Sequence, residues 1–474
     1  MSQPLPSDLR ESGPEDRVPL REKIALGCGF VTSQGSHNVV HVLASPVYNV
    51  TLGMNPALIS VLFFVQRIWD MMVDPLAGQV SDNFRSRFGR RRPLLGIAIV
   101  PLSVFFAGLW LLPRNVGSFS LFLYVLVVSL LFYAARSFYA IPLLGLQAEA
   151  TQDYHGRTRL TGFTQIFFFV FAIAPSWLFA WVQGPMFAEP VAGVHCVGYV
   201  LGALFLLTGL VPVFLTRERL YGQVARYQER APLWQTLRMV AANRPFVRIL
   251  GMQCMASFGY NVVGVFGMYA TFYYVYAGDI RSASIMQGWA GTAYQVAAIG
   301  SIFLFRRISL AKGKKWTLQF SAGILMLGSA AKMFLFQPHH PWLLVLVWVA
   351  NGAGTTGITV LGLSMMADAV DYEELQTGAR REGAYASALS FCDKIGYSLG
   401  ALLSGFILVG IGFDVRLGGG QSAQTLYLIR LLYAVLPFAG ALGAALLIHR
   451  YPLSEDRVGE IKDALQARRR QASA

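Results

Sequence analysis

The chain has 474 residues, of which 55% are hydrophobic and only 14% charged, and its mean hydropathy is +0.49. This composition lies far outside the range of soluble globular proteins. Apolar stretches of about 20 residues or more recur along the chain, each long enough to cross roughly 30 Å of hydrocarbon. The sequence therefore excludes an ordinary soluble protein and predicts a polytopic membrane protein.

The apolar stretches predict an all-α membrane protein with twelve transmembrane helices. In chain order, the predicted spans are residues 22–50, 56–81, 93–113, 117–147, 160–184, 192–216, 246–276, 282–305, 316–337, 341–370, 384–412 and 424–449.

The net charge of +14 is distributed in alternation with these spans, so no single basic domain is present and we expect no nucleic-acid partner. Lys and Arg gather in cytoplasmic loops of membrane proteins. Their distribution here places both termini and the long middle loop in the cytoplasm. We expect a multi-pass protein of the plasma membrane, or of the inner membrane in a bacterium.

A basic middle loop divides the spans into six and six, and the two halves echo one another. Gly89 and the three arginines after it follow the second span, and Gly313 and two lysines follow the eighth. Such a repeat predicts the major facilitator fold of two six-helix halves. The predicted segments are a cytoplasmic segment at 1–21, a first half at 22–216, a cytoplasmic loop at 217–245, a second half at 246–449 and a cytoplasmic tail at 450–474.

Three charged residues interrupt the second span. Arg67, Asp70 and Asp74 are spaced i, i+3 and i+7, so they share one helical face. Charges within a membrane face the bundle interior and find partners there. Arg67 and Asp70 fit a structural ion pair, but one arginine does not neutralise two carboxylates. The surplus negative charge at Asp74 invites a metal cation or a proton.

Other polar residues lie within predicted spans, where a central cavity needs them. Two histidines in the first span fit a proton relay, and hydrogen-bonded helix packing explains them equally well. The residues are Ser33, Gln34, His37, Asn38 and His41 in the first span, Arg136 and Ser137 in the fourth, Asn351, Thr355, Thr356 and Thr359 in the tenth, and Asp393 and Lys394 in the eleventh.

Charged residues of opposite sign also gather at predicted cytoplasmic span ends of the two halves. Arg85 and Arg90 follow the second span, whereas Asp368, Asp371 and Arg380 lie at the end of the tenth. They predict a cytoplasmic gate that latches the halves together, and a merely solvated loop is the alternative.

No enzyme motif is present, and the glycine-rich stretches lack the strand and helix context of phosphate loops. We expect the stretch at Asn351 to serve close helix packing and the one at Gly418 to form an exterior loop. The sequence predicts neither an enzyme nor a bound cofactor.

Three long motifs in order resemble the glycoside–pentoside–hexuronide cation symporters, the melibiose permease-like family of the major facilitator superfamily. They are RIWDMMVDPLAGQVSDNFRSRFGRRRP, IPLLGLQAEATQDYHGRTRL and MADAVDYEELQTGARREGAYASALSFCDKIGYSLGALLSGFIL. The resemblance runs from about Lys23 to about Ile448.

The resemblance implies a cation site formed by Asp70, Asp74 and the Ser137 hydroxyl, with Lys394 close enough to compete with the cation. We assign Lys394 and Arg67 to coupling. Where sodium-coupled relatives have an asparagine, this chain has Val73, which removes an oxygen. Coupling by Na+ at the two aspartates and coupling by H+ therefore both stay open.

The sugar pocket that the resemblance implies differs from that of galactoside carriers. An aspartate, a tryptophan and an arginine of those carriers are replaced by Ala140, Leu144 and Gln165. Arg136 is absent from the pocket of those carriers. The planar N–H donors of its guanidinium match the oxygens of carboxylates and sulfonates, which predicts an acidic sugar. Arg136 could instead pair with Asp70 or Asp74. The predicted substrate-binding residues are Arg136, Gln34, His37, Ala140, Leu144, Gln165 and Lys394.

Together these features predict a symporter that imports a sugar or sugar derivative, a glycoside or hexuronide, by alternating access. A cation-dependent carrier of lysolipids or other amphipathic solutes is the alternative with the same fold, and a non-transporting membrane sensor is a remote one. We expect the partners to be the sugar, a monovalent cation and the bilayer, and the protein to act as a monomer.

Overall fold

The structure is a computed structural model that describes residues 18–87, 89–113, 117–151, 154–216, 218, 243–377, 382–453 and 455–472. All the regular elements in these residues are helical. The chain forms two compact units. Unit 1 comprises the chain up to Ala44, the segment Ile68–Leu178 and the stretch from Pro185 that includes α8 (Pro190–Leu215). Unit 2 comprises Ser45–Arg67, Phe179–Gly184 and the described chain from α10 (Arg244–Asn261) onward.

Unit 1 contains a first helix broken by a π-helical turn, followed by the later part of α3 and by α4 to α8. Its elements are α1 (Leu20–Phe30), the π-helical turn η3 (Val31–Gly35), α2 (Ser36–Ala44), α3 (Pro56–Asn83) from Ile68 onward, α4 (Arg92–Trp110), α5 (Ser118–Glu149), α6 (Tyr154–Phe171), the first part of α7 (Pro175–Val182) and α8 (Pro190–Leu215).

Unit 2 contains most of the second half of the chain. Its elements are η4 (Ser45–Thr51), the start of α3, the end of α7, α10 (Arg244–Asn261), α11 (Phe266–Tyr269), η6 (Ala270–Val275), α12 (Ile280–Lys312), α13 (Lys314–Leu335), η7 (Pro341–Leu343), α14 (Leu344–Thr377), α15 (Glu382–Gly410), η8 (Val415–Gly420), α16 (Ala423–His449) and α17 (Glu455–Ala472).

Ten helical segments of the described chain are long and apolar enough to cross a membrane. They confirm the prediction of an all-helical membrane protein. The helical run Leu20–Thr51 and helix α12 correspond to the first and eighth predicted spans and are not among the ten. Both carry polar side chains along their length, so the count of twelve stays a prediction.

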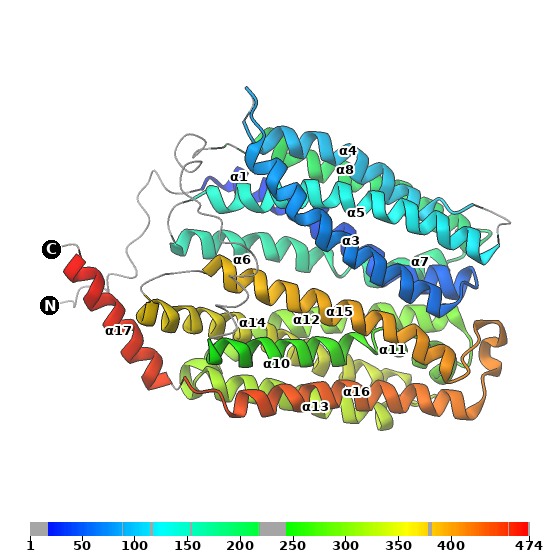
Figure 1. Cartoon of the computed structure of the whole chain (residues 1–474). Coiled ribbons are helices and arrows are strands. Elements are labelled where there is room, and N and C mark those ends of the chain that lie inside the picture. The colour runs from blue at the N-terminus through cyan, green and yellow to red at the C-terminus, as the bar shows by residue number, and fades with distance from the viewer. Residues whose placement is uncertain are drawn as a thin grey trace. The chain divides into compact units, whose positions relative to one another are not determined.

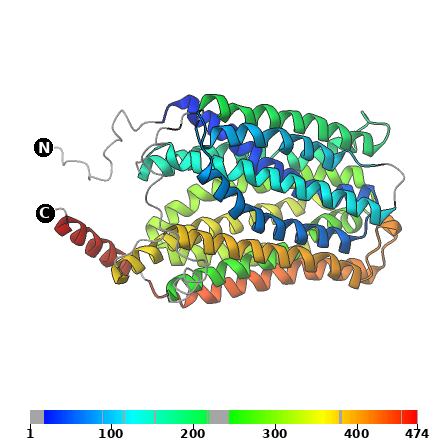
Figure 2. The same cartoon turned by 45° about the horizontal axis from the view of Figure 1, so that its top comes forward.

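Small residues set the helix packing within unit 1. Helix α4 packs against α8 and α5, and the three run side by side in Figure 1 and Figure 2. A Cβ atom added at Gly198 of α8 would lie 2.9 Å from the Cβ atom of Trp110 and 3.1 Å from the carbonyl oxygen of Ala107. Glycine is needed there because the two backbones approach so closely.

In unit 2, α14 packs against α12 and α13, and its glycine-rich stretch faces both. A Cβ atom at Gly354 would lie 2.8 Å from the Cβ atom of Leu325 on α13. At Gly352 it would collide with the carbonyl oxygen of Tyr294 on α12. The glycines that follow Asn351 therefore serve close helix packing, as the sequence predicts.

A tight seam joins the segment Ser45–Arg67 to the second half of the chain inside unit 2. The buried Tyr269 hydroxyl donates to Asn49 Oδ1 at 2.8 Å, and the Gly405 amide donates to Ser60 Oγ at 2.9 Å. Gly405 has no room for a side chain, since a Cβ atom there would overlap Ser60 Oγ and the carbonyl oxygen of Pro56. The first contact joins η4 to α11, and the second holds the start of α3 against α15.

We expect Gly405→Val to loosen this seam, because a Cβ atom would collide with the backbone at Pro56, which does not move aside as a side chain does. Overpacking of this kind costs about 1–3 kcal/mol. Gly410→Val is the matched control on the same helix, since a Cβ atom at Gly410 meets nothing within 4 Å. Thermal unfolding of the two purified variants tests this, and equal unfolding temperatures would refute the tight seam.

Candidate functional site

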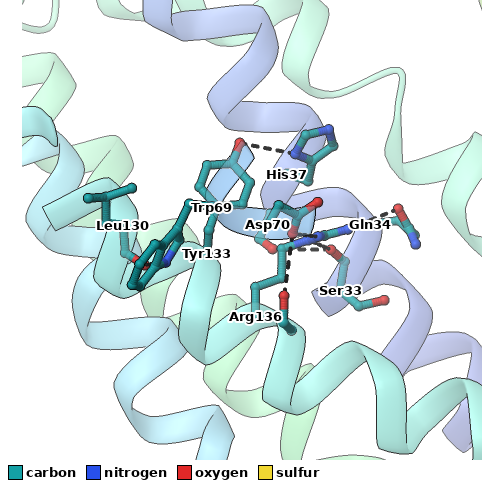
Figure 3. Close-up of polar contacts among 10 residues, drawn as sticks. Ser33, Gln34, His37, Trp69, Asp70, Leu130, Tyr133 and Arg136 are labelled. Carbon is teal, nitrogen blue, oxygen red and sulfur yellow. Dashed lines mark hydrogen bonds and ion pairs between the residues drawn. The ribbon is translucent and has the colours of Figure 1, made fainter. Parts of the chain in front are cut away.

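Asp70 lies at the centre of a buried polar cluster in unit 1 (Figure 3). Its residue is 1% exposed, and its carboxylate faces α5. The Ser137 hydroxyl donates to Asp70 Oδ1 at 3.3 Å, and Arg136 Nη1 lies 3.5 Å from the same oxygen. The structure therefore brings together three of the residues that the sequence singled out, and it shows an ion pair between Arg136 and Asp70.

Arg136 also reaches the first helical run of the chain. Its Nε atom donates to the carbonyl oxygen of Ser33 at 2.8 Å, and Nη2 donates to Gln34 Oε1 at 3.4 Å. Both acceptors belong to the π-helical turn η3 (Val31–Gly35). Single π-helical turns are rare and occur frequently at functional sites. The turn places the Ser33 carbonyl oxygen where the guanidinium can bind it (Figure 3).

Aromatic residues hold the cluster in place. His37 Nδ1 lies 3.1 Å from the Tyr133 hydroxyl, which is on α5 one turn before Ser137. Trp69, directly before Asp70, donates from Nε1 to the carbonyl oxygen of Leu130 at 2.9 Å and so ties α3 to α5. The sequence reasoning missed Trp69 and Tyr133, although both neighbour predicted site residues within one helical turn.

The other charged residues of the predicted cation and coupling sites lie on α3 and α15. Asp74 is half-buried on α3, one turn after Asp70. Arg67 lies in unit 2, with its guanidinium carbon 4.6 Å from the centre of the Tyr397 ring. Lys394 is half-buried on α15, also in unit 2. The carboxylate contacts described above thus pair Asp70 with Arg136, while Arg67 stacks on a tyrosine.

Three further predicted pocket residues lie on α5 and α6 of unit 1. Ala140 is buried, whereas Leu144 on the same helix is 44% exposed and Gln165 on α6 is partly exposed. Their part in substrate binding stays a prediction.

Two of the predicted gate residues, Arg90 and Asp368, form ion pairs within their own units. In unit 1, Arg90 Nη2 lies 2.8 Å from Glu149 Oε1, and Arg85 is exposed. In unit 2, Lys314 Nζ lies 2.6 Å from Asp368 Oδ2. Asp371 is half-buried at the end of α14, and Arg380 lies outside the described residues. The gating role of all these residues stays a prediction.

Glu218 organises the turn that leads into α4, and the sequence reasoning missed it. Its carboxylate accepts the backbone N–H groups of Arg90, Arg91 and Arg92 at 2.8 to 2.9 Å. Gly89, at φ +109°, brings the chain close to this carboxylate. Burial lowers the pKa of the Arg91 guanidinium below its usual value, and the nearby Glu149 carboxylate acts in the opposite direction.

We expect Glu218→Ala to destabilise unit 1, because three backbone donors at the start of α4 lose their acceptor. Hydrogen bonds to charged groups contribute about 1.5–3 kcal/mol each to stability. Glu218 is only half-buried, so water replaces part of these bonds in the variant and the loss of stability is smaller than their sum. Thermal unfolding measures the change, with Glu189→Ala at an exposed position of the same unit as the control. An unfolding temperature equal to that of the control would contradict this role.

A protein-family model described as MFS/sugar transport protein matches residues 25–455, which is most of the chain. The chain belongs to this family. It is therefore a membrane transporter of the major facilitator superfamily and not an enzyme.

Curated relatives cover nearly the whole chain. A putative glycoside/cation symporter of Escherichia coli is 24% identical over 95% of this chain and 95% of its own length. A glucuronide carrier protein homolog of the same species is 27% identical over 87% of this chain and 88% of its own. These matches confirm the melibiose permease-like symporter family that the motifs indicated.

Solved structures support the fold independently. The crystal structure of a mutant of the nucleoside transporter NupG matches with a TM-score of 0.63 and covers 90% of this chain and 99% of its own. Its sequence is 17% identical, so the likeness shows the fold alone. It confirms the major facilitator fold predicted from the repeated layout.

Proposed function

We propose that this transporter imports a sugar or sugar derivative together with a monovalent cation by alternating access of its two halves. The observation that carries the proposal is the buried carboxylate of Asp70, 1% exposed on a membrane helix of a symporter family. Charged groups at membrane depth are costly and mark substrate or ion pathways. The carriers named above for glycosides and glucuronides favour a sugar derivative.

Asp70, Asp74 and Ser137 form the proposed cation site. The Ser137 hydroxyl donates a hydrogen bond to Asp70 Oδ1, and the half-buried Asp74 follows one helical turn later on α3. Two carboxylates and one hydroxyl offer few oxygens for a sodium ion, and the buried Val73 offers none. A proton needs a single carboxylate, so the same site serves either Na+ or H+.

Arg136 is the proposed substrate anchor. Its guanidinium contacts the Asp70 carboxylate, and it is held at the π-helical turn by Ser33. A planar fork of N–H donors recognises carboxylates and sulfonates better than it recognises neutral hydroxyls. We therefore propose an acidic sugar, in particular a hexuronide, as the substrate class, with transport across the plasma or inner membrane.

Counterflow in proteoliposomes tests the substrate class without any gradient. We expect trapped methyl glucuronide to drive entry of labelled methyl glucuronide, and the neutral methyl glucoside to be a weaker partner. Exchange of the glucoside alone would support sugar transport but contradict the proposal of an acidic substrate. Exchange of a lysolipid and of neither sugar would favour the amphipathic alternative.

A further inference from the structure

Pro437 lies inside helix α16 of unit 2 and deprives one carbonyl oxygen of its usual partner. In an α-helix, the carbonyl oxygen of each residue accepts the backbone N–H of the residue four positions later. Proline has no backbone N–H, so Pro437 cannot donate to the carbonyl oxygen of Tyr433. Both residues are buried, and a buried carbonyl group without a donor is costly. This oxygen therefore needs a partner from outside the helix.

Lys332 of α13 is that partner. Its Nζ atom donates to the carbonyl oxygen of Tyr433 at 3.1 Å and lies 3.9 Å from the centre of the Tyr433 ring. The lysine is 1% exposed on a helix long and apolar enough to cross the membrane. Such a side chain is costly at membrane depth. The carbonyl oxygen that Pro437 leaves free and the tyrosine ring together explain why it is tolerated there.

A second contact runs in the opposite direction between the same two helices. Arg430 of α16 donates from Nη2 to the carbonyl oxygen of Met333, and its guanidinium carbon lies 4.1 Å from the centre of the Tyr274 ring. Met333 is in the last turn of α13, which ends at Leu335, so its carbonyl oxygen has no donor within the helix. Each helix thus gives a basic side chain to a carbonyl oxygen that the other helix leaves unpaired.

The part of α16 that follows Pro437 is held by its backbone. A Cβ atom added at Gly440 would lie 2.7 Å from the carbonyl oxygen of Met255 on α10 and 3.0 Å from the Cα atom of Gly259. Backbones that approach this closely are held by van der Waals packing. Pro437 therefore lies between a segment fixed by backbone contact with α10 and residues 423–436, which carry both contacts with basic side chains.

We infer that α16 is hinged at Pro437, and that Lys332 and Arg430 clamp residues 423–436 to α13. A proline removes a main-chain hydrogen bond, and sharp helix bends occur at such positions. The bond from Lys332 replaces the missing one and holds the helix in one direction. Without this bond, the carbonyl group of Tyr433 admits water or the helix bends toward another donor. The clamp lies within unit 2 and needs neither the sugar nor the cation.

Amide hydrogen exchange of the purified full-length protein, with thermal unfolding beside it, tests the clamp. Lys332→Met removes the donor and keeps an apolar side chain of similar length. We expect the amides of residues 423–436 to exchange about tenfold faster in this variant and its unfolding temperature to fall. Lys315→Met is the matched control, because it makes the same change at the other end of α13, where Nζ donates to the carbonyl oxygen of Tyr451. It should leave exchange in residues 423–436 unchanged.

Pro437→Ala gives the decisive comparison, because alanine restores an N–H group for the carbonyl oxygen of Tyr433. We expect Lys332→Met to have little effect on exchange in the Pro437→Ala background. Arg430→Gln should speed exchange equally in both backgrounds, since its acceptor belongs to α13. If Lys332→Met alone does not fold, the double variant with Pro437→Ala should fold and should exchange as Pro437→Ala alone does.

Four results would overturn the clamp or one of its two contacts. Unchanged exchange in Lys332→Met would show that the bond to Tyr433 holds nothing. An equally large effect of Lys332→Met with Pro437→Ala present, or failure of that double variant to fold, would show that the lysine does not replace the missing bond. Unchanged exchange in Arg430→Gln would remove the arginine from the clamp.

Discussion

We expect Asp74→Asn to abolish cation-driven accumulation of the sugar and to leave exchange across the membrane largely intact. The reason is that Asp74 is a half-buried carboxylate of the proposed cation site, one turn after Asp70 on α3, and an amide at this position has no negative charge to bind a cation. A tenfold gradient of the coupling cation supplies about 1.4 kcal/mol, enough for roughly tenfold accumulation of a sugar carried with one cation. The variant should only equilibrate the sugar, as radiolabel uptake into proteoliposomes will show.

Asp82→Asn is the matched control for this experiment. It makes the same change on α3 about two turns further along, at a side chain that is 46% exposed and 3.8 Å from Arg91 Nη2. We expect it to accumulate sugar as the unmodified protein does. Full accumulation by Asp74→Asn would remove Asp74 from the cation site.

We expect Asp70→Asn to destabilise the protein and a second change at Arg136 to restore much of the loss. Removing one partner of a buried ion pair leaves an uncompensated charge and costs about 3–5 kcal/mol. The side chains here are 2% and 10% exposed, so solvent screens the pair little. The Ser33 carbonyl oxygen still binds the guanidinium, so we expect the lower end of this range.

Thermal unfolding of four purified proteins measures this coupling: the unmodified chain, Asp70→Asn, Arg136→Gln and the double variant. We expect the double variant to be more stable than the sum of the single effects predicts, by about 1–3 kcal/mol. Strictly additive effects would show that the 3.5 Å contact contributes nothing to stability.

The broad architecture could be predicted from the sequence because it depends on local patterns. Span length and hydropathy require no tertiary information, and they lead to the all-helical membrane fold that the structure and the comparisons confirm. The spacing of Asp70 and Asp74 placed both on one helix face for the same reason. Arg136 pairing with Asp70 was one of two alternatives that the residues left open, and the structure shows that contact.

The finer features could not be predicted because they depend on distant or irregular contacts. The anchor of Arg136 is the Ser33 carbonyl oxygen at a π-helical turn, and a pattern with a period of about 3.6 residues gives no sign of such a turn. The seam at Gly405 joins residues 345 positions apart. Glu218 binds the backbone near Arg91 from 127 positions away, and side-chain patterns do not reveal a backbone partner.

The most direct test of cation-coupled sugar transport is gradient-driven uptake of methyl glucuronide into proteoliposomes, with a sodium gradient or a proton gradient imposed in turn. We predict accumulation above the external concentration with one of the two gradients, and its loss when an ionophore collapses that gradient. Uptake that only equilibrates under both gradients, or no uptake of any sugar, would contradict the proposed symport.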